Sequence, residues 1–306
     1  MKFGSMSLKF KVFLCVMFLQ VMAVIPAYAH NSLLYTDKSV AEVGETVDVI
    51  ASISEPFGTP DFPFYFNERI DYTYGPLKMA AFKGDSVSDL DIAYCDIRDG
   101  TKKKYTDKEV EAAYLDQKGA DPKGGDSYTW MGRVFNCDVG EYKIPSEGTV
   151  SFAAASSYGT DTVVKSFMKT FVNLTADGES TKARAPHFAF DGIEIRPVDD
   201  LASVKAGGKV RVEALLNGKP QSGVVVYSGY KDMPDGLRVS PVLEYSETLD
   251  PIYCAGVTDV NGVVELKLPE IPSGTEELKD AYLFTDGHLT VEKVRYRATI
   301  SFNLKK

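Results

Sequence analysis

The chain contains three histidines, and His30 stands at the position with the most distinctive chemistry. It follows Ala27-Tyr28-Ala29, which has the small-x-small pattern of a signal-peptidase site. Cleavage after Ala29 would give His30 a free α-amine, and this amine and the ring Nδ1 can chelate one metal ion together. Imidazole suits Ni²⁺, Co²⁺, Cu²⁺ and Zn²⁺. His30 is therefore predicted to be a metal ligand, the alternative being a residue that the peptidase simply leaves first.

Residues 1–29 are predicted to form a cleavable secretory signal peptide. Lys2, Lys9 and Lys11 give a positive start, and an apolar run follows over residues 12–24. The run is too short for a stable transmembrane helix. No second apolar stretch of spanning length follows, so we expect an exported mature chain without direct membrane insertion.

The charge of the mature chain argues against nucleic acid as a partner. Removing the three lysines of the signal lowers the basic residues from 34 to 31 against 43 acidic ones, a net charge of −12. Acidic exported proteins bind nucleic acid and anionic lipid poorly. The surface carboxylates are expected to serve solubility.

Three cysteines remain after the signal: Cys95, Cys137 and Cys254. Export leads to an oxidising compartment, and Cys95 and Cys137 are the likelier disulfide pair because we expect them to share a domain. Cys254 is expected to be free, buried and inert. The absence of a C-x-x-C spacing argues against a thiolate zinc site or a dithiol redox site.

Apolar alternation predicts a mainly β fold of two β-sandwich domains, the second immunoglobulin-like in size and rhythm. The linker is placed at residues 176–186, which separate a first domain (30–175) from a second (187–306). Strands are predicted over residues 46–53, 149–153, 166–174, 193–195, 210–216, 224–227, 263–268 and 296–304.

One short helix is predicted inside the first domain. Thr106 and Glu109 have the spacing of a capping box ahead of a segment that extends to Leu115. This segment lies in a polar stretch over residues 98–126, which we interpret as an insertion between strands.

A series of short motifs in a fixed order resembles one known family. The motifs are His30 directly after the signal, Gly44-Glu45-Thr46-Val47, Glu55-Pro56-Phe57-Gly58, Gly140-Glu141-Tyr142, Lys165-Ser166-Phe167, Ile193-Glu194-Ile195-Arg196-Pro197-Val198, Lys205-Ala206-Gly207-Gly208-Lys209-Val210, Asn217-Gly218-Lys219-Pro220, Thr258-Asp259-Val260-Asn261-Gly262, His288 and Tyr296-Arg297-Ala298-Thr299-Ile300-Ser301-Phe302. Together they resemble the periplasmic family of unknown function formerly described as the NikM-like component of nickel transport.

The resemblance implies a periplasmic, two-domain, non-enzymatic protein beside a membrane transporter that takes up nickel or cobalt. It gives His30 and His288 more weight as metal ligands than His187, which is interpreted as a linker residue. A carboxylate such as Asp286 completes the hypothetical site. The alternative for His288 is an exposed position in a loop or at the start of the last hairpin.

Two other functions remain open at the level of sequence. A structural or protein-interaction module without metal is one, and an outward-facing cluster of Phe62, Phe64 and Phe66 would favour it. The other is a copper-dependent polysaccharide monooxygenase. This chain resembles such enzymes only in the terminal His30. The segment Asp259-Val260-Asn261-Gly262 is predicted to be a hairpin turn, because the rest of a calcium loop does not follow.

Overall fold

The protein is mainly β throughout the part of the chain that the structure, a computed structural model, describes. The described residues are 31–54, 63–64, 77–97, 103–106, 108–109, 112, 136–158, 163–176, 185–188, 190–230, 254–268, 270 and 280–304. Their strands are β1 (Asn31–Thr36), β2 (Thr46–Ser54), β3 (Lys78–Lys83), β4 (Ser86–Asp89), β5 (Ile92–Asp96), β6 (Lys103–Tyr105), β7 (Cys137–Lys143), β8 (Val150–Tyr158), β9 (Val163–Val172), β10 (Ile193–Pro197), β11 (Lys209–Leu216), β12 (Lys219–Pro220), β13 (Val225–Tyr230), β14 (Cys254–Val257), β15 (Val263–Lys267), β16 (Asp280–Val291) and β17 (Val294–Asn303).

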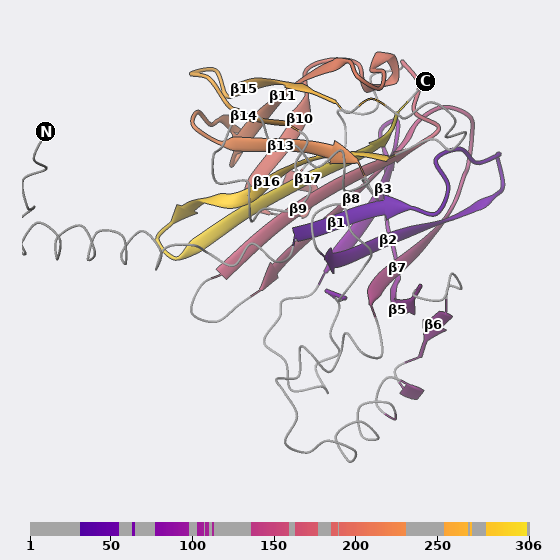
Figure 1. Cartoon of the computed structure of the whole chain (residues 1–306). Helices are drawn as coiled ribbons and strands as arrows, with labels where there is room; N and C mark the ends of the chain where they lie inside the picture. Colours follow the sequence, from indigo (N-terminus) through magenta and orange to yellow (C-terminus); the bar gives the residue numbers. More distant parts are fainter. Residues whose placement is uncertain are drawn as a thin grey trace, which may run out of the picture.

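These strands form three sheets, of which the largest is central and the two smaller ones pack on it. The central sheet has eight strands in the order β14-β13-β16-β17-β9-β8-β3-β4. A five-stranded sheet has the order β1-β2-β7-β5-β6, and a smaller one contains β10, β11 and β12 with β15 paired to β11. In Figure 1, β9 and β17 run side by side through the middle of the molecule.

Alternation along β9 shows how the sheets are layered. Phe171 packs in a core with the strands of the β10–β11–β15 sheet. The next residue, Val172, packs together with Met168 in a different core, which contains residues of β1 and β2. Successive side chains of a strand point to opposite faces. The two smaller sheets therefore cover opposite faces of the central sheet, and the predicted β-sandwich architecture is confirmed.

The central sheet crosses the predicted linker. The first half of the chain supplies β3, β4, β8 and β9, and the second half supplies β13, β14, β16 and β17. The two halves meet where β9 pairs in parallel with β17, from Val163 opposite Val294 to Lys169 opposite Ile300. The two halves thus share hydrogen bonds within one sheet. The predicted domain boundaries and the immunoglobulin-like character of the second half stay predictions.

The segment after the predicted linker packs against one face of β9. Phe190 stacks on Phe167, with 5.7 Å between the ring centroids. Lys169 forms an ion pair with Glu194, and both side chains are buried. The chain is thereby held to the central sheet by apolar and charged contacts alike.

The predicted helix lies largely outside the described residues. The reciprocal contacts of the capping box are present: the backbone N–H of Thr106 donates to Glu109 Oε2 (2.8 Å), and the N–H of Glu109 donates to Thr106 Oγ1 (3.4 Å). The backbone is helical at Lys108, Glu109 and Ala112. These few positions do not establish the helix-containing insertion, which stays a prediction.

The described part of the chain has no helix with the length and hydropathy needed to cross a bilayer.

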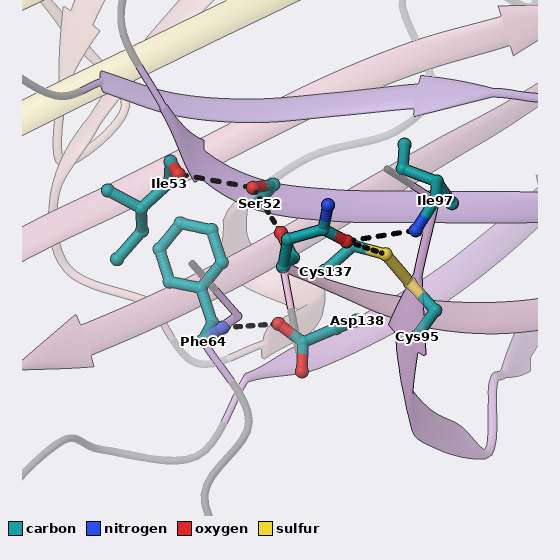
Figure 2. Close-up of a disulfide and its surroundings, with 8 residues drawn as sticks. Ser52, Ile53, Phe64, Cys95, Ile97, Cys137 and Asp138 are labelled. Carbon is teal, nitrogen blue, oxygen red and sulfur yellow. Dashed lines mark hydrogen bonds between the residues drawn. A yellow bond between two sulfur atoms is a disulfide. The ribbon is translucent and has the colours of Figure 1, made fainter. Parts of the chain in front are cut away.

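The disulfide prediction is confirmed, and the prediction for the third cysteine is wrong in part. Cys95 and Cys137 lie opposite each other on β5 and β7 with their Cα atoms 5.0 Å apart, within the usual range for a disulfide. Figure 2 shows this bond beside Ser52 and Asp138. Cys254 is free as expected, but it is only half-buried because it lies on β14, the edge strand of the central sheet.

Candidate functional site

The strand that begins one residue after His30 is fixed onto the central sheet by side-chain hydrogen bonds. The Ser32 hydroxyl donates to Ser166 Oγ on β9 (2.8 Å). On β17, Thr299 Oγ1 donates to the carbonyl of Ser32 (2.6 Å), and Ser301 Oγ donates to the carbonyl of Leu34 (2.6 Å). In Figure 1, β1 lies in indigo beside β9 and β17. These contacts set both the position and the direction of the first strand.

Below the start of β1 lies a row of polar residues across four strands, which we call the polar row. It consists of Ser156 on β8, Ser166 on β9, Arg297 on β17 and Asp286 on β16, each directly opposite the next. The first three are 2%, 0% and 7% exposed. Two residues further along β9 on the same face is Met168, part of the apolar core. The polar row thus adjoins the apolar core at Met168 and continues the polar contacts that Thr299 and Ser301 make with β1.

His288 lies in an irregular part of β16 at the end of the polar row. The antiparallel pairing of β16 with β17 runs as far as Asp286 and resumes at Thr290. Residues 287–289 therefore stand opposite a single residue of β17, Tyr296. Such β-bulges re-aim side chains and are frequent beside active sites. The sequence left His288 in a loop or at a hairpin start, and the structure places its backbone inside a long strand.

The fold brings the start of β1 and the bulge to the same end of the central sheet. Ser32, two residues after His30, contacts Ser166, and two strand spacings separate Ser166 from Asp286. Adjacent strands lie about 4.8 Å apart, so this backbone separation is about 10 Å. His30 itself lies outside the described residues. Its role as a ligand, with His288 and Asp286, stays a prediction.

His187 lies apart from this site. It follows the linker in a short 3₁₀ turn, η2 (Ala185–Phe188), and its ring packs edge-on against Phe82 with 5.3 Å between centroids. Its Nε2 is 3.1 Å from Asp89 Oδ1. Phe82 belongs to a cluster with Phe167, on the face of the central sheet opposite Met168 and the polar row. His187 therefore packs on the face of the central sheet opposite the polar row.

The described side chains do not by themselves form a metal site. Among them, no three His, Cys, Asp or Glu residues come together as such a site requires. His30 and the side chains of Asp286 and His288 are not among the described groups. The sequence did not identify Ser32, Ser156, Ser166 or Arg297 as site residues, since polar residues inside strands carry no such signal without their cross-strand neighbours.

Phe64 does not face outward, as the interaction hypothesis requires of Phe62, Phe64 and Phe66 together. Phe64 is buried in the core between the five-stranded and central sheets. Its backbone N–H donates to the carboxylate of Asp138, which is also fully buried (Figure 2). Phe62 and Phe66 lie outside the described residues.

Residues 259–262 form a turn as predicted, but it is not a hairpin turn, because β14 pairs with β13 and β15 pairs with β11 in a different sheet. Asp259 Oδ1 accepts hydrogen bonds from the backbone N–H groups of Asn261 (2.8 Å) and Val263 (2.9 Å). These bonds favour the charged carboxylate and lower the pKa of Asp259 below its ordinary value. The carboxylate is therefore committed to closing the turn between β14 and β15.

The model of a domain of unknown function, DUF4198, matches residues 27–271. The chain belongs to this family. The match spans the predicted linker and includes His30, but it ends before β16, which carries Asp286 and His288. The predicted membership of a family of unknown function is confirmed at this level.

No curated protein matches the chain significantly. Among solved structures, the D0–D1 domain of intimin is 11% identical, with 88% of this chain and 96% of that chain covered and a TM-score of 0.21. Yersinia pseudotuberculosis adhesin InvE is 9% identical, covering 91% and 60%, with a TM-score of 0.24. A DUF4785 family protein from Legionella pneumophila is 9% identical, covering 83% and 52%, with a TM-score of 0.24. Likeness at these TM-scores carries no argument about function.

Proposed function

We propose that the protein is an exported, periplasmic accessory protein that captures a divalent transition metal, nickel or cobalt, for a membrane uptake transporter. His30 would bind the metal through its α-amine and imidazole after signal cleavage. His288 would supply a second imidazole and Asp286 a carboxylate. Three nitrogen donors and one oxygen suit Ni²⁺ or Co²⁺, and Cu²⁺ and Zn²⁺ accept the same donors.

One observation carries this proposal: β1 is fixed at its very start, against the polar row that ends at Asp286. The buried contact of Ser32 with Ser166 holds the chain two residues from His30, and the bulge that contains His288 adjoins the same row. Ser32 and Asp286, although distant in sequence, thereby lie at one end of the central sheet. A terminal chelate needs such an anchored terminus, because ordering a free chain end costs conformational entropy.

Calorimetric titration of the mature protein with Ni²⁺ and Co²⁺ tests the proposal, after mass spectrometry has established that the chain begins at His30. His30→Ala and His288→Ala should each weaken binding at least about tenfold, since even residues behind metal ligands contribute that much. His187→Ala is the matched control and should leave the affinity unchanged. A protein that retains Ala29 keeps both imidazoles but lacks the free amine at His30, and it should bind as weakly as His30→Ala.

The proposal fails if the correctly processed protein binds none of the four metals at micromolar concentration, or if His30→Ala binds as well as the unchanged protein. Cleavage of polysaccharide in the presence of copper and a reductant would instead assign the monooxygenase activity.

A second candidate, a protein-interaction module, is favoured by a different feature. Val40 and Val43 are 70% and 55% exposed on the loop between β1 and β2, where they line an open hollow with Glu42 and Glu45. Asn173 holds this loop in place through two hydrogen bonds to the backbone of Ala41 (2.9 and 2.8 Å). A Val40→Ser/Val43→Ser double variant that loses a partner while keeping its metal affinity would support this function.

A further inference from the structure

We infer that β4 receives an extended cationic segment of a partner protein as an added strand of the central sheet. β4 and β14 are the two edge strands of this sheet. All four residues of β4 are exposed, so solvent reaches the strand on both of its faces. Five strand spacings separate β4 from β16, which carries His288, and the inference therefore does not depend on the proposed metal site.

The pairing of β4 with β3 directs backbone groups of β4 away from the sheet. Leu90 donates its N–H to the carbonyl of Met79. In antiparallel pairs, hydrogen-bonded and non-hydrogen-bonded residues alternate. By the register of the hairpin, Ser88 therefore bonds to β3, whereas Val87 and Asp89 turn their N–H and C=O groups outward. An edge of this kind is a template for a further strand.

The side chains along this edge are acidic. The segment from Gly84 to Ile92 contains three aspartates and no basic residue. The side chain of Asp89 is 84% exposed, although His187 Nε2 lies 3.1 Å from it. Asp91, two residues further on, is also exposed. An added strand with Lys or Arg opposite these two aspartates would gain cross-strand charge pairs.

The lysines of β3 do not pair with these two aspartates. The ammonium of Lys83 donates to the backbone carbonyls of Glu147 and Thr149. Lys78, at the other end of β3, forms no ion pair with a described side chain. The negative charge of the edge is therefore left for a partner to balance.

A second copy of the chain does not fit this edge. Antiparallel pairing of β4 with itself would set aspartates of the two copies against each other, with no basic residue on either strand. Like charges on paired strands are destabilising. Val87, which is 43% exposed at the middle of the edge, favours an aliphatic neighbour. The fitting segment thus has basic residues opposite Asp91 and Asp89, followed at the same interval of two by an aliphatic residue.

The test is a fluorescence anisotropy titration of the protein with three labelled peptides. The first is Thr-Lys-Thr-Lys-Thr-Val-Thr, and the second has Glu in place of both Lys. The third keeps the lysines but is N-methylated at the second Lys and at Val, so that it cannot donate to the edge. The first should bind at least about tenfold more tightly than either of the others, since they lose two charge pairs or two backbone hydrogen bonds. It should also slow hydrogen exchange at the amides of Val87 and Asp89.

Two variants locate the binding at β4. Val87→Pro removes an outward N–H, which edge strands tolerate, and should weaken binding of the lysine peptide about tenfold. Asp89→Lys/Asp91→Lys should reverse the preference in favour of the glutamate peptide. Val257→Pro is the matched control on the uncharged edge strand β14. Val257 also turns its N–H outward, because Thr258 donates to Val224 on β13, and this variant should bind as the unchanged protein does.

Urea unfolding establishes that each variant is folded, and the charge reversal decides the matter if Val87→Pro is not. The inference is overturned if the lysine peptide does not bind at millimolar concentration, or if it binds no better than its N-methylated form, since charge alone would then explain the contact. A dimer of the unchanged protein that Val87→Pro dissociates would assign the edge to a second copy and overturn the inference as well. None of these outcomes affects the proposed metal site.

Discussion

The two faces of the central sheet bury polar groups in different ways. On the face toward the β10–β11–β15 sheet, Lys169 and Glu194 form a closed ion pair that joins β9 to β10. On the face toward β1, the polar row leaves the Ser156 hydroxyl without a described partner and ends beside a bulge. The first set joins the two halves of the chain, whereas the second fixes β1 to the central sheet and leaves one hydroxyl unused among the described residues.

The largest expected effect on stability comes from breaking the ion pair between Lys169 and Glu194. Lys169→Met would leave Glu194 buried without its cation, and removing one partner of a buried pair typically costs about 3–5 kcal/mol. Urea unfolding of the mature protein measures this loss. The double variant Lys169→Met/Glu194→Met should recover most of the stability, because no buried charge is then left alone. A loss below about 1 kcal/mol in the single variant would remove the contrast between the two faces.

The next effect concerns the anchor of β1. Ser166→Ala leaves the buried Ser32 hydroxyl without its acceptor and should lower the free energy of unfolding by about 1–2 kcal/mol. If the start of β1 positions His30, the same variant should also weaken Ni²⁺ binding in the calorimeter. Unchanged affinity together with lowered stability would show that the anchor serves the fold alone.

A smaller effect is expected at the surface pair of Lys165 and Asp191, which lies on the same side of β9 as the closed pair. The hydrogen bond from Lys165 lowers the pKa of Asp191, whose side chain is 73% exposed. A lowered pKa contributes stability that is present above the ordinary pKa of an aspartate and is lost as the pH falls through the lowered value. Asp191→Asn should therefore cost less than about 1 kcal/mol at neutral pH, with the difference vanishing in acid and at high salt. A difference that persists in acid would contradict this origin.

The smallest effect on stability is expected at Ser156. Ser156→Ala removes a buried hydroxyl that forms no described hydrogen bond, so the free energy of unfolding should change by less than about 0.5 kcal/mol or rise slightly. The measurement is the midpoint of thermal unfolding of Ser156→Ala, compared with the midpoint of Ser166→Ala. A loss as large as that of Ser166→Ala would mean that Ser156 has a structural partner, and the contrast between the faces would weaken.

The alternation of β11 could be predicted from the sequence, whereas β1 and β3, which are buried on both faces, were not predicted. In β11, buried and exposed residues alternate over much of the strand, and the predicted range of 210–216 agrees with Lys209–Leu216. In β3, four consecutive residues, 79–82, are buried, so no alternation marks the strand. β1 likewise buries Ser32 to Tyr35 in succession. Period-two patterns report a difference between two faces, and they are lost where both faces meet a core.

The candidate site was predictable only in part for a related reason. Histidine and aspartate can be recognised as possible metal ligands from residue type alone, and His288 and Asp286 were predicted as ligands in this way. The serines of the polar row cannot, because Ser166 gains its significance from contacts with β1 and β17, which are distant from it in sequence. The contact between Thr299 and Ser32, 267 residues apart, is the clearest case.

The sequence by itself determined the mainly β class, many of the strands, the turn at Asp259, the Cys95–Cys137 pair and the family of unknown function. These depend on residue type, spacing and local turn chemistry. Only the tertiary structure decided that one sheet crosses both halves of the chain, that His187 lies on the opposite face from the polar row, and that β1 starts against that row. Such facts follow from which strands pair and in what register, and pairing over hundreds of residues leaves no local pattern in the chain.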